Sequence, residues 1–174
     1  HFYATWLKTP IPQFPLIGLI ASGGHTDLVL MEGHGEYSWL GGTRDDAAGE
    51  CFDKAARLSG LGYPGGPAIQ TNASTVDKKR LNTTKRLPRP MLNQDNLDFS
   101  FSWLKTSVLQ TTKEEPVTPK TSRELAHEIQ EAITDVLVKK TVKAAKKHQI
   151  KTIIVAGGVA ANKRLKEKFQ STLD

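Results

Sequence analysis

Adjacent glycines stand next to residues that suit a ligand in three stretches of the sequence. Gly157-Gly158 follows an apolar run and precedes Asn162 and a predicted amphipathic helix. Glycine has no Cβ, so its backbone lets a ligand come close, and the free N–H groups at a helix start attract phosphate. One such pair could be an ordinary strand-to-helix turn, but three predict loops that converge on one ligand. The other two pairs lie in Ser22-Gly23-Gly24 and Gly65-Gly66.

Three carboxylates share one face of a helix predicted over residues 45–58. Asp46, Glu50 and Asp53 are spaced by four and three residues, which places them on the same side, and small residues occupy the opposite side. Asp45 is expected at the helix N-terminus, where a carboxylate is favourable. The acidic face has two interpretations that the spacing leaves open: a ligand-binding face or a solvated surface.

Composition and missing motifs exclude several classes of protein. The hydrophobic fraction of 38% and charged fraction of 24% are typical of a globular chain, and the net charge of +6 allows a nucleic-acid partner without requiring one. Cys51 is the only cysteine, so no intramolecular disulfide can form. The sequence contains no P-loop, no G-x-S-x-G elbow and no HExxH pair.

Apolar runs and turn residues predict an α/β fold. Strands are expected over 16–22, 26–31 and 36–40, and the tight turns between them indicate an antiparallel meander. A further buried strand is expected over 153–156. Because a helical region separates this strand from the first three, the sheet should be mixed. Residues 1–15, with three prolines, are expected to form a connector.

The middle of the chain is predicted to be helical with two exposed connections. A helix should begin within 98–106, and a capping-box pattern at Thr121–Glu124 should open the longest helix, which runs to about His148. The segments 71–90 and 111–120 are expected to be surface connections. Lysines crowd the second half of the long helix, where a solvated face and the helix dipole explain most of them. They are Lys139, Lys140, Lys143, Lys146 and Lys147.

Four long motifs occur in a fixed order from one end of the chain to the other. They are SGGHT, DDAAGECFDKAARLSGLGYPGGP, RPM followed by LDFSFSWLKT, and AGGVAANKRL. In this order they resemble the catalytic subunit family of tRNA threonylcarbamoyladenosine synthase, the Gcp/TsaD family of bacterial type, formerly called O-sialoglycoprotein endopeptidase. The resemblance implies one lobe of the actin/Hsp70/sugar-kinase fold, with residues 16–174 as an incomplete second lobe, 1–15 as the inter-lobe connector and the first lobe absent.

The resemblance also implies a reaction and a set of site residues. The family transfers the threonylcarbamoyl group from threonylcarbamoyl-AMP to the exocyclic amine of the adenosine next to the anticodon of tRNA. The resemblance does not identify a catalytic side chain in this sequence. Relatives often carry Asp where this chain has Gln70, whose amide can hydrogen-bond a hydroxyl but carries no charge. The substrate- and nucleotide-binding positions implied are Ile20, Ala21, Ser22, Gly23, Gly24, Asp53, Gly66, Gln70 and Asn162.

A metal ion and protein partners follow from the same resemblance. His1 matches the second histidine of the family's HxxxH motif, so one divalent metal ion is expected, with iron favoured and zinc or magnesium as alternatives. The implied partners are tRNA, a paralogous subunit of the same fold and a small ATPase subunit, in the cytoplasm and without a membrane. With one of three metal ligands and one lobe, these 174 residues alone are expected to be inactive.

Two other functions remain open at this point. An ATPase or kinase of the same superfamily would use the same cleft for phosphoryl transfer from ATP. A non-catalytic paralogous binding subunit would keep the fold without the reaction.

Overall fold

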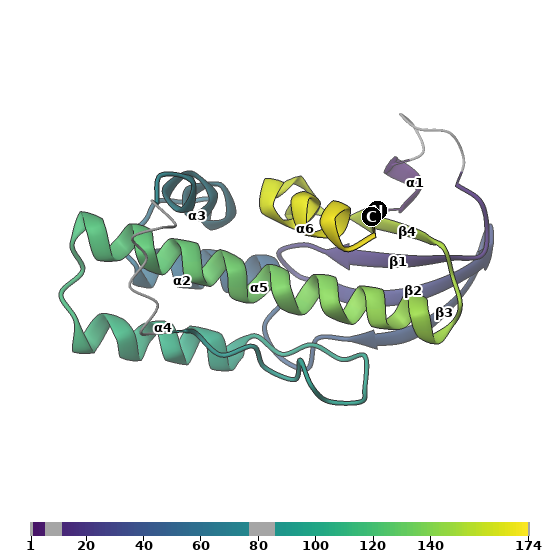
Figure 1. Ribbon diagram of the computed structural model, residues 1–174, viewed down its shortest axis with the longest axis horizontal. Helices are drawn as coiled ribbons and strands as arrows, with labels where there is room; N and C mark the ends of the chain where they lie inside the picture. Colours follow the sequence, from purple (N-terminus) through teal and green to yellow (C-terminus); the bar gives the residue numbers. More distant parts are fainter. Residues whose placement is uncertain (1, 6–11, 77–85, 174) are drawn as a thin grey trace.

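The computed structural model describes residues 2–5, 12–76 and 86–173. Figure 1 shows the four strands at one end of the molecule, α2, α3 and α4 at the other, and α5 running along both. None of the described helices combines the length and apolar character of a membrane span. The elements are α1 (Phe2–Thr5), β1 (Leu16–Ala21), β2 (Thr26–Gly33), β3 (Glu36–Gly42), α2 (Ala48–Leu58), α3 (Gly65–Ser74), α4 (Ser102–Glu114), α5 (Pro119–Lys147), β4 (Thr152–Ala156), the 3-10 turn η2 (Gly158–Ala161) and α6 (Lys163–Leu173).

The strands form one mixed sheet in the order β3-β2-β1-β4. β1 pairs antiparallel with β2 and parallel with β4, and β2 pairs antiparallel with β3. β1 is apolar throughout because both of its faces are covered: Ile17 and Leu19 belong to the main core, and Leu16 packs with Phe2 in a smaller cluster. The prediction of an α/β lobe with a mixed sheet, an antiparallel meander and flanking helices is confirmed.

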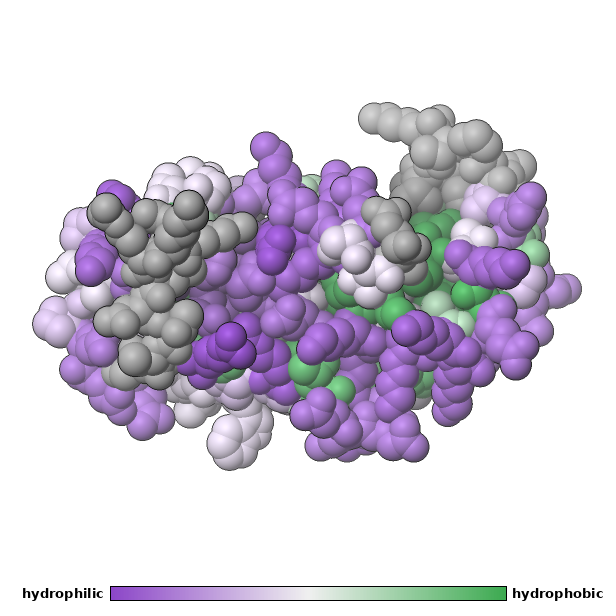
Figure 2. Space-filling model, in the orientation of Figure 1, coloured by the Kyte–Doolittle hydropathy of each residue, from purple (hydrophilic) through white to green (hydrophobic). Residues whose placement is uncertain are grey.

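The main core follows the long helix α5, which packs against the sheet at one end and against α2, α3 and α4 at the other. Ile129, Ile133 and Leu137 are fully buried along one stripe of α5, as the apolar spacing predicted. Figure 2 shows a largely hydrophilic surface on the viewed face, with hydrophobic side chains gathered around β4 and the neighbouring strands. β4 is at an edge of the sheet, and Ile153, Ile154 and Val155 are only half-buried.

One of the lysines expected on a solvated face is instead part of the interior. Lys140 is 1% exposed, and its Nζ donates to the backbone oxygen of Asn96 at 2.8 Å. Burial, and after it the nearby Lys143, lowers the pKa of this ammonium group. Lys140 therefore fastens the 92–98 segment to α5, and the prediction is wrong for this residue.

The start of α2 differs from the prediction because a residue from another element caps it. α2 begins at Ala48 rather than near Asp45, and the buried Thr26 Oγ1 accepts from the Ala48 N–H at 2.8 Å. The Asp45 carboxylate points to α4, where its Oδ1 accepts from the N–H groups of Phe101 at 2.7 Å and Ser102 at 3.1 Å. Asp45 therefore caps a helix more than fifty residues further along the chain.

Two other helix boundaries also differ. The segment expected as a connection from residue 71 is in part the helix α3, which begins at Gly65 and buries Ile69 and Ala73. α5 begins at Pro119, with Thr118 as its N-cap, so Thr121 is the third residue of the helix. The Thr121 Oγ1 accepts from the Thr118 N–H at 2.8 Å, the reciprocal half of a capping box displaced by three residues from the predicted one.

Candidate functional site

A cavity of about 300 Å³ lies where the glycine turns of three elements meet. Its walls come from the turn after β1, the middle of α2, the first turns of α3 and the η2–α6 junction. Five of the nine expected substrate-binding residues line it. The complete lining is Gly23, Gly49, Phe52, Asp53, Pro64, Gly66, Pro67, Gln70, Gly158, Val159, Ala161 and Asn162.

The other four expected residues lie beside the cavity rather than in its wall. The Ile20 side chain packs against the smaller apolar cluster, and Ala21 is fully buried in the main core. The Ser22 Oγ accepts from the N–H groups of Gly24 at 3.4 Å and His25 at 3.0 Å, which closes the turn after β1. These residues shape the turn that presents Gly23 to the cavity.

The two glycines of a pair have different roles in two of the three turns. A Cβ on Gly157 would collide with the Ala21 carbonyl, and Gly157 has φ of 96°, which only glycine adopts readily. A Cβ on Gly65 would lie 2.5 Å from the Phe52 carbonyl oxygen. By contrast, a Cβ on Gly66 or on Gly158 would meet no protein atom within 4 Å. The first glycine is therefore required by the fold, and the second leaves open space at the cavity.

The turn after β1 is held against the start of α2. The Gly49 N–H donates to the Ser22 carbonyl at 2.9 Å, and a Cβ on Gly49 would lie 2.6 Å from that oxygen. This close approach requires glycine at position 49. It places the N-terminus of α2 directly beside the Ser22-Gly23-Gly24 turn, where the partial positive charge of the helix end favours an anion.

Asp53 joins α2 to α3 at the cavity wall. Its Oδ1 accepts from the Gly65 N–H at 2.7 Å, which satisfies one of the free donors at the start of α3. Asp53 is half-buried and lines the cavity. The carboxylate therefore has a structural bond through one oxygen, and within the described residues no partner is found for the other oxygen.

The other two carboxylates of the acidic face share one lysine as an ion-pair partner. The Lys54 Nζ lies 2.9 Å from Asp46 Oδ1 and 2.7 Å from Glu50 Oε1. Hydrogen bonds to Glu50 and then Asp46 raise the pKa of Lys54. Of the three carboxylates, Asp53 is the one that lines the cavity.

The first turn of α6 is fastened to two other helices by side-chain amides. The Gln70 Oε1 on α3 accepts from the Lys163 N–H at 2.7 Å. The Asn162 Oδ1 accepts from the Leu165 N–H at 3.0 Å, which makes Asn162 the N-cap, and its Nδ2 donates to Gln130 Oε1 on α5 at 3.1 Å. Because Gln70 uses its oxygen in this way, the group it has left for a ligand is its NH₂ donor.

Gln130 is a residue of this site that the sequence analysis did not identify. It is 6% exposed and lies among the apolar residues of the α5 stripe, four positions after Ala126 and three before Ile133. A polar amide at a buried position of such a stripe needs a partner. That mismatch was the available signal, although it could not have shown that the partner is Asn162.

A network of charged side chains fixes the outer side of α6 to α5. The Glu131 carboxylate accepts from Arg164 Nε at 2.6 Å and contacts Lys168 Nζ at 2.9 Å. Burial disfavours ionisation of Glu131, but the hydrogen bonds from Arg164 and Lys168 outweigh it and lower the pKa of Glu131 to about 2. The network stabilises the helix whose N-cap, Asn162, lines the cavity.

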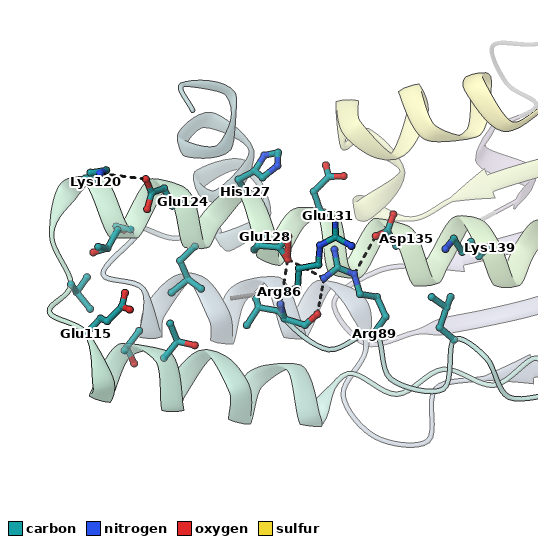
Figure 3. Close-up of a pocket in the computed structure, with 18 residues that line it drawn as sticks. Arg86, Arg89, Glu115, Lys120, Glu124, His127, Glu128, Glu131, Asp135 and Lys139 are labelled. Carbon is teal, nitrogen blue, oxygen red and sulfur yellow. Dashed lines mark hydrogen bonds and ion pairs between the residues drawn. The ribbon is translucent and has the colours of Figure 1, made fainter. Parts of the chain in front are cut away.

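A larger pocket of about 670 Å³ lies between α4 and α5 and contains none of the expected site residues. Figure 3 shows Arg89 between Glu128 and Asp135 of α5. The Arg89 guanidinium lies 2.9 Å from the Glu128 carboxylate and 3.2 Å from that of Asp135. Arg86, in its wall, follows directly on the undescribed residues 77–85. Its lining shares no residue with the cavity of the glycine turns.

The expected metal ligand His1 lies outside the described residues. Among residues 2–5, 12–76 and 86–173 there is no group of three His, Cys, Asp or Glu side chains that could hold a metal ion. His25, in the turn after β1, is exposed. The described part of the chain thus offers no set of ligands that fits the metal implied by the resemblance.

Known proteins with similar sequences extend over the whole chain. Residues 1–174 match the family described as tRNA N6-adenosine threonylcarbamoyltransferase. A protein of that name from Symbiobacterium thermophilum is 47% identical over 100% of this chain and 50% of its own length. Another from Dehalococcoides mccartyi is 51% identical over 97% of this chain and 49% of its own length. The chain thus spans about half the length of the curated relatives it matches.

Proposed function

The chain belongs to the tRNA N6-adenosine threonylcarbamoyltransferase family, and from this we propose that the protein modifies tRNA by threonylcarbamoyl transfer. The group would pass from threonylcarbamoyl-AMP to the exocyclic amine of the adenosine next to the anticodon. The observation that carries the proposal is the convergence of Gly23, Asp53, Gly66, Gln70 and Asn162 on one cavity. Its volume of about 300 Å³ lies at the small end of the range for ligand pockets.

Each cavity residue has a role that its contacts allow. The free oxygen of Asp53 would accept from ribose hydroxyls, and the open backbone at Gly66 and Gly158 would lie against the nucleoside. The NH₂ of Gln70 would donate to an acceptor atom of the nucleotide. The Ser22-Gly23-Gly24 turn, beside the N-terminus of α2, would receive the phosphate and the acyl group, with Ile20 and Ala21 beneath it.

Orientation would supply most of the rate acceleration. The adenosine amine is a weak nucleophile. Holding it against the carbamoyl carbon makes a bimolecular reaction effectively unimolecular. The amine nitrogen forms the new bond to that carbon, the bond from the carbon to the phosphate oxygen breaks, and AMP leaves as the amine loses a proton. The glycine turns would hold AMP throughout, and we assign no side chain of this chain as the proton acceptor.

A divalent metal ion remains a proposal carried by the family resemblance alone, with iron favoured over zinc or magnesium. Its one expected ligand here, His1, is not described, and the described residues provide no ligand set. No step of the reaction above is assigned to the metal. If bound, it would supply a charge that polarises and orients the threonylcarbamoyl end.

We also propose that residues 16–174 belong to the second lobe of the fold and that 1–15 connect it to the first. The half-buried apolar residues of the edge strand β4 support further packing at that side of the sheet. In the cell, the protein would act in the cytoplasm on tRNA with a paralogous subunit and a small ATPase subunit.

The test is a transfer assay with the intact protein as encoded. It would be incubated with threonylcarbamoyl-AMP, unmodified tRNA and the partner subunits, and modified adenosine would be measured by mass spectrometry of digested tRNA. We expect modification that depends on Asp53. Phosphoryl transfer from ATP without modified adenosine would contradict the proposal and support the kinase alternative. The 174 residues alone are expected to give no modification above background.

A further inference from the structure

Gln130 is a buried residue of α5 whose side-chain oxygen accepts a hydrogen bond from the residue that precedes α6. Its Oε1 accepts from Asn162 Nδ2 at 3.1 Å, and both side chains are nearly buried, at 6% and 8% exposed. Inside a protein such a bond is specific, because a buried amide that loses its partner has no water to replace it. Asn162 therefore has one preferred side-chain orientation, which Gln130 defines together with the Leu165 N–H.

That orientation determines the wall of the cavity at the η2–α6 junction. With Nδ2 on Gln130, the Asn162 Oδ1 is left to accept from the Leu165 N–H and start α6. The residues Gly158, Val159, Ala161 and Asn162 of this junction all line the cavity. The Oδ1 and Nδ2 atoms of Asn162 both bond to protein groups. Asn162 would therefore act on the ligand by fixing the backbone of the η2–α6 junction.

We propose that Gln130 is a positioning residue of the nucleotide cavity, acting through Asn162 without contact to the ligand. It does not line the cavity, whereas Asn162 does. The inference rests on the proposed function, in which this cavity holds the AMP part of the substrate. Without the Gln130 bond, only the bond to the Leu165 N–H holds the Asn162 side chain, and other orientations become populated. The apparent affinity then falls by the fraction of molecules in which the wall is correctly formed.

The test measures AMP affinity and thermal midpoint for two variants in the intact protein. Gln130→Met keeps the size of the side chain and removes the acceptor, and we expect AMP to bind about tenfold more weakly. Gln130→Glu keeps an acceptor for Asn162 Nδ2, because burial favours the uncharged carboxyl group at this position, so binding should stay within about twofold of wild type. Gln110→Met on the exposed face of α4 makes the same chemical change away from the cavity and should not alter binding.

A double-mutant cycle separates action through Asn162 from general destabilisation. On an Asn162→Ala background, Gln130→Met should cause no further loss of AMP affinity, because the bond through which it acts is already missing. If Gln130→Met does not fold, Gln130→Asn removes the same contact by shortening the side chain. Equal AMP affinity in wild type and the folded acceptor-removing variant would overturn the inference, as would a full additional loss on the Asn162→Ala background. If wild type itself fails to bind AMP, the proposed function of the cavity is what fails.

Discussion

The Oδ1 atom of Asp53 lies 2.7 Å from the backbone nitrogen of Gly65 and accepts its hydrogen bond. The two residues belong to different helices, so this bond sets the position of α3 against α2 at the cavity. One oxygen of this carboxylate serves the fold, and in the proposed function the other serves the ligand. Substitutions at position 53 should therefore change stability and affinity separately.

Asp53→Ala should reduce both the stability and the AMP affinity, and Asp53→Asn should reduce mainly the AMP affinity. The alanine variant loses the cap on α3, which costs about 1 kcal/mol of unfolding free energy. It also loses the acceptor that we propose for the ribose hydroxyls. Loss of a charge-assisted bond of roughly 1.5–3 kcal/mol weakens AMP binding by about ten- to a hundredfold. The asparagine variant keeps an oxygen for Gly65, so its thermal midpoint should stay near that of wild type. Unchanged AMP affinity in both variants would remove Asp53 from the site.

The glycine pair at the start of α3 provides matched substitutions. Gly66→Ala places a methyl group where no protein atom lies within 4 Å, so apo stability should be unchanged or rise by up to about 1 kcal/mol. The methyl group would enter the space of the ligand, and we expect AMP affinity to fall more than tenfold. Gly65→Ala meets the Phe52 carbonyl and should cost about 1–3 kcal/mol of stability. Calorimetric titration and thermal melts distinguish the two, and wild-type AMP affinity for Gly66→Ala would show that the space is unused.

Asp45 should be important for stability and dispensable for the cavity. Its carboxylate accepts from the Phe101 and Ser102 N–H groups and from the Ser100 and Ser102 hydroxyls. Asp45→Ala should therefore cost about 2 kcal/mol in urea unfolding. Asp45→Asn, which keeps an acceptor, should cost less. AMP affinity should be unchanged in the folded variants, and a large loss of affinity would mean that the α4 start contributes to the site.

The same carboxylate should contribute to acid sensitivity. Burial opposes the ionisation of Asp45, but hydrogen bonds from Ser100, Phe101 and Ser102 outweigh it, so its pKa is lowered from the ordinary value of 3.8. A group with a depressed pKa in the folded state adds stability above its unfolded pKa and loses it as the pH falls through the folded value. The stability difference between wild type and Asp45→Ala should accordingly shrink below about pH 4.

Glu131 should account for a larger part of the pH dependence. Its pKa of about 2 lies below the ordinary value of 4.5, so its ionisation adds roughly 3 kcal/mol at neutral pH, lost as the pH falls from 4.5 towards 2. Glu131→Gln should remove this contribution and approach wild type near pH 2 in urea melts. Glu167→Gln, which affects an exposed partner of Arg164 at 3.2 Å, is the matched control and should change stability by under about 0.5 kcal/mol. If the two substitutions changed the unfolding free energy equally, the larger contribution expected of the more buried Glu131 would be contradicted.

Local sequence was sufficient to predict the elements that are defined by a repeated pattern of neighbouring residues. The apolar runs of β1 and β4 and the turn residues between the first strands predicted the mixed sheet, because alternation and turn chemistry depend on near neighbours. The apolar stripe of α5 predicted the core helix for the same reason. The double glycines indicated the loops that converge on the cavity, although not which glycine of each pair the fold requires.

Contacts between distant residues decided the rest. Asp45 and Thr26 cap helices to which they do not belong, so the start of α2 could not be found from its own residues. α3 begins with Gly-Gly-Pro, a poor helical sequence, and is helical because Ile69 and Ala73 are buried in the main core. The bond between Gln130 and Asn162 joins residues 32 positions apart. Helix propensity and hydrophobic pattern depend on residues that are close in the sequence. A buried polar group is stable only beside its hydrogen-bond partner, and the tertiary fold brings that partner within reach.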